Sequence, residues 1–248
     1  MELNQYQYMF EAEDKHWWYV GNHENFMSLL KRQRLLKDHV RVLDAGCGTG
    51  KWLDLMKKSN TIIETGLDFQ PKALEYARTR GAFNLLQGDV NAALFNPGSF
   101  DLITCFDVIC NRHVEDNSVL SNFSSYLTSE GHLLITVPAY NFLKSKHDRV
   151  VHTGKRYTRK QLKQLLEKNG FSIIKLSYTV SFLFPLALVK RMTDKLSFTD
   201  TKNHNEVKIP PQIINKLFLC VMRIENTILK FISLPFGLSV MALAKKKD

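Results

Sequence analysis

The sequence lacks the features that mark metal-binding, secreted or membrane-spanning proteins. It shows neither a CxxC pair nor Cys/His ligand spacing among its four cysteines, Cys47, Cys105, Cys110 and Cys220. No metal site is therefore predicted, and no apolar signal stretch opens the chain. The apolar run that ends at Val189 is about 12 residues long, whereas a helix needs about 20 to cross a bilayer. We therefore expect a cytoplasmic, reduced protein without a transmembrane span.

The chain does contain enough apolar residues for one core, and an excess of positive charge. With 248 residues, 44% of them hydrophobic, it can bury one substantial core, which favours a single structural domain with an elaboration. The formal charge is +10, and nine Lys and Arg residues fall between positions 144 and 168 against two acidic residues. This basic segment favours anionic partners, such as phosphorylated substrates, anionic lipid or nucleic acid.

Short β-branched runs alternate with helical stretches from residue 40 onward. The predicted strands are Val40–Leu43, Ile62–Leu67, Phe83–Leu86, Phe100–Phe106, His132–Val137, Phe171–Val180 and Leu238–Ala244. The predicted helices of this region are Lys51–Lys58, Pro71–Arg80, Ser118–Leu127 and Thr158–Lys168. Such alternation predicts an α/β fold with a Rossmann-like, doubly wound and mainly parallel sheet.

Helical periodicity also flanks this core, from Glu24 to Lys37 and from Ile213 to Phe231. The roughly 55 residues between the sixth and seventh strands exceed an ordinary connection, which indicates a functional cap or lid. We divide the chain into an N-terminal helical segment (1–39), a core (40–180), a helical cap (181–236) and a final strand with a basic tail (237–248).

A glycine-rich loop follows the first predicted strand. Gly46, Gly48 and Gly50 form G-x-G-x-G, which permits a tight turn and close approach of a ligand to the backbone. A purely structural turn is the alternative. A dinucleotide-binding loop would need G-x-G-x-x-G, and its third glycine is missing just before Trp52.

Two acidic residues follow the next two strands. Asp68 lies 22 residues after Gly46, near the spacing at which a ribose-binding acid follows such a loop. Phe69 could flank an adenine ring, and Asp89 could accept the proton of its exocyclic amine. The three features together predict a pocket for a nucleoside cofactor.

These residues resemble the motifs of class I S-adenosylmethionine (SAM)-dependent methyltransferases. The resemblance covers roughly residues 40–178 plus the last strand, and it rests on Asp44-Ala-Gly-Cys-Gly-Thr-Gly50, Gly66-Leu-Asp68, Gly88-Asp89 and Phe100-Asp-Leu-Ile. It implies a seven-stranded mixed sheet whose last strand is antiparallel, with SAM as the cofactor.

The resemblance also implies a role for each site residue. Asp44 and the glycine loop, including Cys47, would hold the methionine part of SAM. Asp68 would hold the ribose, and Asp89 with Val90 the adenine. The two residues that would border the reactive methyl group are Phe106 and Asp107.

A narrower resemblance points to small-molecule and glycan-cluster methyltransferases of bacteria. It rests on His16-Trp17-Trp18-Tyr19, Pro138-Ala139-Tyr140, His147-Asp148, His152 and Lys155-Arg156-Tyr157-Thr158. We expect Trp17 and Tyr19 to fold over the cofactor, with core packing as the alternative. The sequence departs from these proteins after Asp107, where Cys110-Asn111-Arg112 precedes His113.

The loop after the fifth strand supplies candidates for a catalytic base. Transfer to a hydroxyl needs positioning and a base that titrates near the operating pH, and histidine fits best. We predict His147 as the base, oriented by Asp148, with His152 and His113 as further candidates. The alternative is that these histidines are solvated or bind a substrate phosphate.

The leading hypothesis is O-methylation of a small-molecule, sugar or lipid-linked acceptor. RNA or protein methylation through the basic segment and a non-catalytic SAM-binding scaffold are the alternatives. Neither an Asn/Asp-Pro-Pro-Tyr/Phe motif nor a Pro-Cys pair is present. Their absence argues against amino-methylation of adenine or glutamine and against cytosine C5 chemistry.

Peripheral contact with a membrane is a further hypothesis. The apolar stretches of the cap, beside Lys190-Arg191 and with a tri-lysine tail, would suit shallow contact with an anionic bilayer. Packing into the protein core is the alternative. No oligomeric state is predicted.

Overall fold

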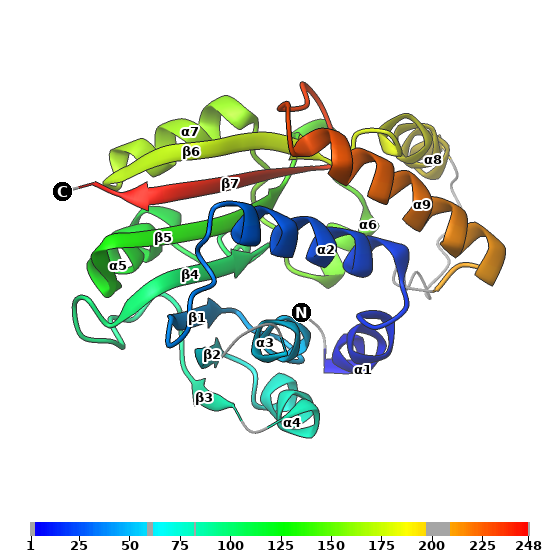
Figure 1. Cartoon of the computed structure of the whole chain (residues 1–248). Helices are drawn as coiled ribbons and strands as arrows, with labels where there is room; N and C mark the ends of the chain where they lie inside the picture. The colour runs from blue at the N-terminus through cyan, green and yellow to red at the C-terminus, as the bar shows by residue number, and fades with distance from the viewer. Residues whose placement is uncertain (1–2, 59–61, 82, 197–208, 248) are drawn as a thin grey trace.

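The computed structural model describes residues 3–58, 62–81, 83–196 and 209–247. Its centre is a seven-stranded sheet in the order β3-β2-β1-β4-β5-β7-β6 (Figure 1). The strands are β1 (Arg41–Ala45), β2 (Ile63–Asp68), β3 (Asn84–Gln87), β4 (Phe100–Phe106), β5 (Leu127–Pro138), β6 (Phe171–Thr179) and β7 (Ser239–Lys246). Strand β7 is antiparallel to both of its neighbours, and the other pairs are parallel. The predicted fold class is therefore confirmed.

Apolar side chains on both faces of the central strands explain why helices cover the sheet on two sides. The helices are α2 (Trp17–Arg32), α3 (Lys51–Lys57), α4 (Pro71–Arg80), α5 (Asp116–Tyr126) and α7 (Arg159–Lys168). Leu102 belongs to the cluster formed with α2 and α3, whereas its neighbour Ile103 belongs to the cluster formed with α5 and α7. Alternate residues of one strand thus serve opposite layers.

The segment between β6 and β7 contributes α8 (Phe184–Leu196) and α9 (Gln212–Leu229). Helix α9 lies along α2 (Figure 1), where Arg223 and Glu24 form an ion pair of 2.7 Å. The Asn226 amide also donates to the carbonyl of Gly21 at 2.8 Å. Glu225 is 1% exposed and accepts hydrogen bonds from the backbone of Ser181 and Phe182, just before α8. No helix in the described ranges has the length and apolarity needed to span a membrane.

Several element boundaries differ from the sequence-based ones. Helix α2 begins at Trp17 rather than near Glu24, and α1 (Leu3–Ala12) precedes it. The chain passes directly from α5 into β5 at Leu127.

The basic tail is also different from the expected one. Lys245 and Lys246 belong to β7, where the Lys245 ammonium pairs with Glu130 at 2.7 Å and that of Lys246 donates to a backbone carbonyl. The last strand therefore runs two residues further into the lysine tail than expected, because β7 pairs with both β5 and β6 along this stretch.

Candidate active site

The glycine loop turns sharply between β1 and α3. The φ angles of Gly46, Gly48 and Gly50 are 83°, 53° and 81°, a region that glycine adopts most readily. The amides of Gly46 and Cys47 both donate to the carbonyl of Leu67, at 2.7 and 2.9 Å. A Cβ atom on Gly46 would lie 2.2 Å from Val108, so the loop has no room for a side chain there.

Asp68 lies at the end of β2, against this loop. One carboxylate oxygen accepts from the Gly48 amide and the other from the Gln70 amide, both at 2.9 Å. Burial raises the pKa of this carboxyl group. The structure therefore brings together the two features that the sequence placed 22 positions apart. Phe69, the next residue, is 64% exposed at the same strand end.

Asp44 lies beneath the loop at the end of β1. It is 2% exposed and accepts a hydrogen bond of 2.8 Å from the Thr104 hydroxyl of β4. Burial raises its pKa to about 7, and the nearby Asp68 adds to the shift. The Cys47 thiol is also buried and has a raised pKa, so it is a packing residue in this loop.

Asp89 and Val90 lie beyond the end of β3. The Asp89 carboxylate is exposed and accepts from the Asn91 backbone and side chain, each at 2.9 Å. Val90 packs partly against the main core cluster. The adjacent Gly88 amide donates to the Asp68 carbonyl at 3.1 Å, which keeps this turn next to the second strand end.

The end of β4 carries a residue in an unusual conformation. Asp107 has a φ of 56°, which is uncommon outside glycine and occurs often at functional sites. Burial raises its pKa to about 6, while Arg156 and a hydrogen bond from Thr136 oppose the shift. Phe106 instead faces the helices, stacked 4.5 Å from Phe26. Of the two residues predicted beside the methyl group, only Asp107 therefore has polar neighbours.

The two aromatic residues expected over the cofactor have different surroundings. Tyr19 has a raised pKa because it is buried and because the carboxyl groups of Glu13 and Asp107 are close. Trp17 packs edge-on against Phe218 of α9, with ring centroids 5.4 Å apart. The structure thus places Trp17 against α9, whereas Tyr19 is affected by the charge of two carboxyl groups.

Helix α1 and the residues after it cover the glycine loop, which the sequence did not indicate. Glu13 is 7% exposed, accepts a short hydrogen bond from the Thr49 hydroxyl and pairs with Arg80 at 3.2 Å. Arg80 also donates to the Thr49 carbonyl at 3.0 Å and lies over the Phe10 ring. The N-terminal segment is therefore held against the loop by the buried side chain of Arg80, by the Thr49–Glu13 hydrogen bond and by an ion pair of Asp14 with Lys51.

What we call the buried acidic group consists of Glu13 and Asp44, which are buried, together with Asp68 and Asp107, which are half-buried. Burial raises the pKa of Glu13 to about 7, and the neighbouring Asp44 contributes. The negative charge of Asp68 also raises the pKa of Asp44, and the charges of Glu13 and Asp107 raise the pKa of Tyr19. The positive charge of Arg80 lowers the pKa of Glu13, and that of Arg156 lowers the pKa of Asp107, but burial outweighs both effects.

The loop after β5 holds the histidines predicted for catalysis. His147 is the second residue of α6 (Lys146–Val150), but its side chain lies outside what the structure describes. His152 has a φ of 60°, and its ring centroid lies 6.0 Å from that of His113. Asp148 is 4% exposed, and its two oxygens accept from Arg156 at 2.9 and 3.1 Å. That carboxylate thus has a structural partner within the loop.

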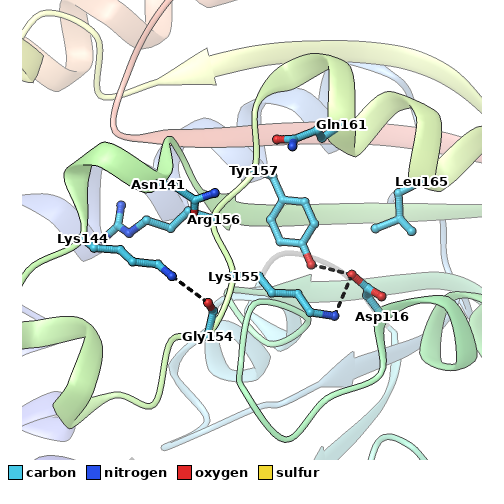
Figure 2. A pocket seen from close by; sticks show the side chains of 9 residues that line it. All are labelled: Asp116, Asn141, Lys144, Gly154, Lys155, Arg156, Tyr157, Gln161 and Leu165. Carbon is cyan, nitrogen blue, oxygen red and sulfur yellow. Dashed lines mark hydrogen bonds and ion pairs between the residues drawn. The ribbon is translucent and has the colours of Figure 1, made fainter.

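A hollow of about 430 Å³ opens beside this loop (Figure 2). In it the Tyr157 hydroxyl donates to Asp116 at 2.8 Å, and the Lys155 ammonium pairs with the same carboxylate at 3.2 Å. Lys144 donates to the Gly154 carbonyl at 3.0 Å. Arg156 lines the hollow, and its positive charge also lowers the pKa of Asp107.

Comparison with known proteins agrees with this arrangement. The methyltransferase domain family matches residues 15–176. A ubiquinone biosynthesis O-methyltransferase from Xanthomonas campestris is 28% identical over 143 residues, which cover 51% of this chain and 58% of the relative. The chain thus spans less than two thirds of that curated relative.

Solved structures share the fold. A SAM-dependent methyltransferase from Mesorhizobium loti has a TM-score of 0.57 at 16% identity, with 86% of this chain and 95% of the other covered. Phosphoethanolamine N-methyltransferase 2 from Haemonchus contortus, in complex with SAM, has a TM-score of 0.60 at 18% identity, with 91% and 52% covered. The chain therefore belongs to the methyltransferase domain family, among the class I SAM-dependent methyltransferases.

Proposed function

We propose that this chain transfers a methyl group from SAM to an oxygen atom of a small-molecule, sugar or lipid-linked acceptor. The observation that carries the proposal is the buried acidic group around the glycine loop. Burial of carboxyl groups is unfavourable unless positive charge compensates them. SAM supplies an ammonium and a sulfonium centre, together with the transferable methyl group.

The described residues offer a partner for each part of this cofactor. We assign the methionine part to Asp44 and the glycine loop, and the ribose hydroxyls to Asp68, whose half-buried carboxylate accepts a hydrogen bond from that loop. Phe69 is a large apolar side chain exposed at the same strand end, which fits stacking on the adenine. Asp89 and Val90 would meet the adenine edge.

The acceptor side needs a group that takes up a proton. As the new oxygen–carbon bond forms and the sulfur–carbon bond breaks, the hydroxyl proton of the acceptor must pass to a base. Asp107, with a pKa near 6, is suited to this at neutral pH, and Tyr19 would help to position the acceptor oxygen. His147 and His152 are the other candidates for the base.

Two groups of the basic segment are engaged in ion pairs within the protein, which favours a small acceptor over RNA. Arg156 is 6% exposed and paired with Asp148, while Lys155 pairs with Asp116. Basic groups that serve as internal partners contribute little to the counterion release that drives nucleic-acid binding. The resemblance to an O-methyltransferase of ubiquinone biosynthesis supports oxygen as the target.

The proposal is tested by incubating the chain with methyl-labelled SAM and cell extract, then separating lipid, small-molecule, RNA and protein fractions. Label is expected in the lipid or small-molecule fraction. Label confined to RNA or protein, or no transfer at all, would refute the proposed acceptor class. Asp107→Asn, His147→Ala and His152→Ala are compared for transfer rate and SAM affinity, because loss of the base abolishes transfer. Loss of a histidine base should leave SAM binding unchanged, whereas Asp107→Asn also removes one charge of the acidic group and should weaken binding.

A further inference from the structure

Exposed apolar side chains are concentrated between β6 and β7. Within the described residues, 18 large apolar side chains are exposed, and 11 of them lie between positions 182 and 236. This segment is less than a quarter of the chain. Single exposed apolar residues are ordinary, whereas a contiguous patch marks a surface that contacts something.

Helix α9 carries much of this patch on one side. Its opposite side is buried against the body of the protein through Met222, Glu225 and Leu229. Exposed apolar residues recur with helical spacing along the other side and just beyond its end, which we call the outer stripe: Ile213, Leu217, Cys220, Ile224 and Phe231. Ile213 is 83% and Phe231 75% exposed.

Basic residues flank the outer stripe. Lys216 and Arg223 of α9 and Lys230 directly after it follow one another at intervals of seven residues and are exposed, and Arg223 forms an ion pair with Glu24 of α2. Close to Phe231, the Arg32 guanidinium lies 5.4 Å from the ring centroid. The only acidic residue of α9, Glu225, is 1% exposed. The surface around the stripe is therefore apolar in the middle and positive at its edge.

We propose that the outer stripe docks the protein on an anionic lipid bilayer, with α9 lying flat in the headgroup region. An apolar stripe with a basic flank is the pattern of helices that bind such interfaces. A second copy of this chain would also cover the stripe, but it would bring two basic edges together on molecules of formal charge +10. An anionic bilayer offers an apolar interior for the stripe and negatively charged headgroups for its basic flank.

The docking helix is joined directly to the candidate site. The Asn215 side chain accepts from the Trp17 amide at 2.9 Å and donates to the Lys15 carbonyl at 2.7 Å. Lys15 and Glu13 of the buried acidic group both lie in the short segment between α1 and α2. The docking surface goes beyond the proposed methyl transfer and does not depend on it.

The test is co-sedimentation of the full chain with phosphatidylcholine vesicles, with and without phosphatidylglycerol. Binding is expected to the anionic vesicles and to weaken as salt is added. Leu217→Asp or Ile224→Asp should lower vesicle affinity by about tenfold or more. Lys216→Gln and Lys230→Gln should each lower it by about fivefold.

The matched control is Ile174→Asp, which makes the same kind of change at an isoleucine that is 42% exposed on β6. It should leave vesicle binding unchanged. SAM titration and thermal unfolding show that each variant is folded. Absence of wild-type binding, or equal binding by Leu217→Asp, would overturn the proposal. A dimer in sedimentation velocity that Leu217→Asp dissociates, without vesicle binding, would assign the stripe to a second copy instead.

Discussion

Burial of carboxyl groups controls the chemistry of the candidate site at the residue scale. The pKa values of Glu13 and Asp44 are raised to about 7 and that of Asp107 to about 6. Each of these groups favours its neutral form more in the folded chain than in the unfolded one. A bound cation would stabilise the charged forms and lower the same pKa values.

SAM affinity should therefore rise with pH. Between about pH 5 and about pH 8 the acidic group changes from mostly protonated to mostly charged, and binding of a cationic ligand releases the remaining protons. Calorimetry in buffers of different ionisation enthalpy measures this release. Affinity that is constant or falls over this range would contradict compensation of charge as the basis of binding.

The ligand-free protein should show the opposite trend in stability. Because the folded pKa values exceed the unfolded ones, these groups stabilise the fold below about pH 4, and this contribution is lost as pH rises to about 7. Added SAM should therefore raise the melting temperature more at pH 8 than at pH 5, as measured by thermal unfolding. An equal increase at both values would count against the assignment.

Asp68 provides the sharpest single substitution. Asp68→Ala should weaken SAM binding by roughly 1 to 3 kcal/mol, because the ribose hydroxyls lose their hydrogen-bond acceptor. Asp101→Asn, at an exposed carboxylate paired with Arg41, is the control and should bind SAM normally. Unchanged affinity in Asp68→Ala would remove this residue from the site.

Sequence spacing was sufficient to predict that some of these residues belong to the site, but not others. The glycine loop and Asp68 were predictable because each directly follows a strand, and parallel strands bring their carboxyl ends to one edge. Glu13 lies 36 positions before its partner Thr49 in a helical segment. No local pattern connects the two, so only the packing of α1 shows that Glu13 belongs to the site.

At the element scale, α1 is fastened to the core through Arg80. Arg80→Met should loosen α1, since it leaves the buried Glu13 without its cation, a change that costs about 3 to 5 kcal/mol in buried pairs. Faster trypsin cleavage at Lys15 and weaker SAM binding are expected. Lys72→Met on the same helix removes an exposed pair with Glu75 and should alter neither property.

The loop after β5 depends on a second buried pair. Arg156→Met should lower the free energy of unfolding by about 3 to 5 kcal/mol, because Asp148 remains buried without a cation. Urea unfolding measures the change, with Arg41→Met at a more exposed pair as the control, for which about 0 to 1 kcal/mol is expected. Equal losses in the two variants would show that burial is not the cause.

Element boundaries were predictable where glycine, proline or a standard cap marks them. Pro71 and the Thr158 capping box begin α4 and α7 at nearly the expected residues. Helix α2 begins after His16, whose ring nitrogen accepts from the Trp18 amide. Histidine is not a common N-cap residue, so sequence patterns missed this start.

At the scale of the whole molecule, alternating strands and helices were enough to predict the sheet, because few arrangements bury both faces of parallel strands. The position of the cap was not predictable. The apolar period of α9 predicted a buried face, but periodicity cannot tell which surface covers an apolar side chain. In the structure one side of α9 packs on α2, and the outer stripe stays exposed.

The central claim is that the buried acidic group and the glycine loop form a SAM site. Isothermal titration of the wild-type chain with SAM and with its demethylated product, S-adenosylhomocysteine, tests this claim most directly. We predict that both ligands bind at a single site and that only SAM, with its sulfonium charge, gains the full increase in affinity at higher pH. Failure of both ligands to bind the folded chain would contradict the account.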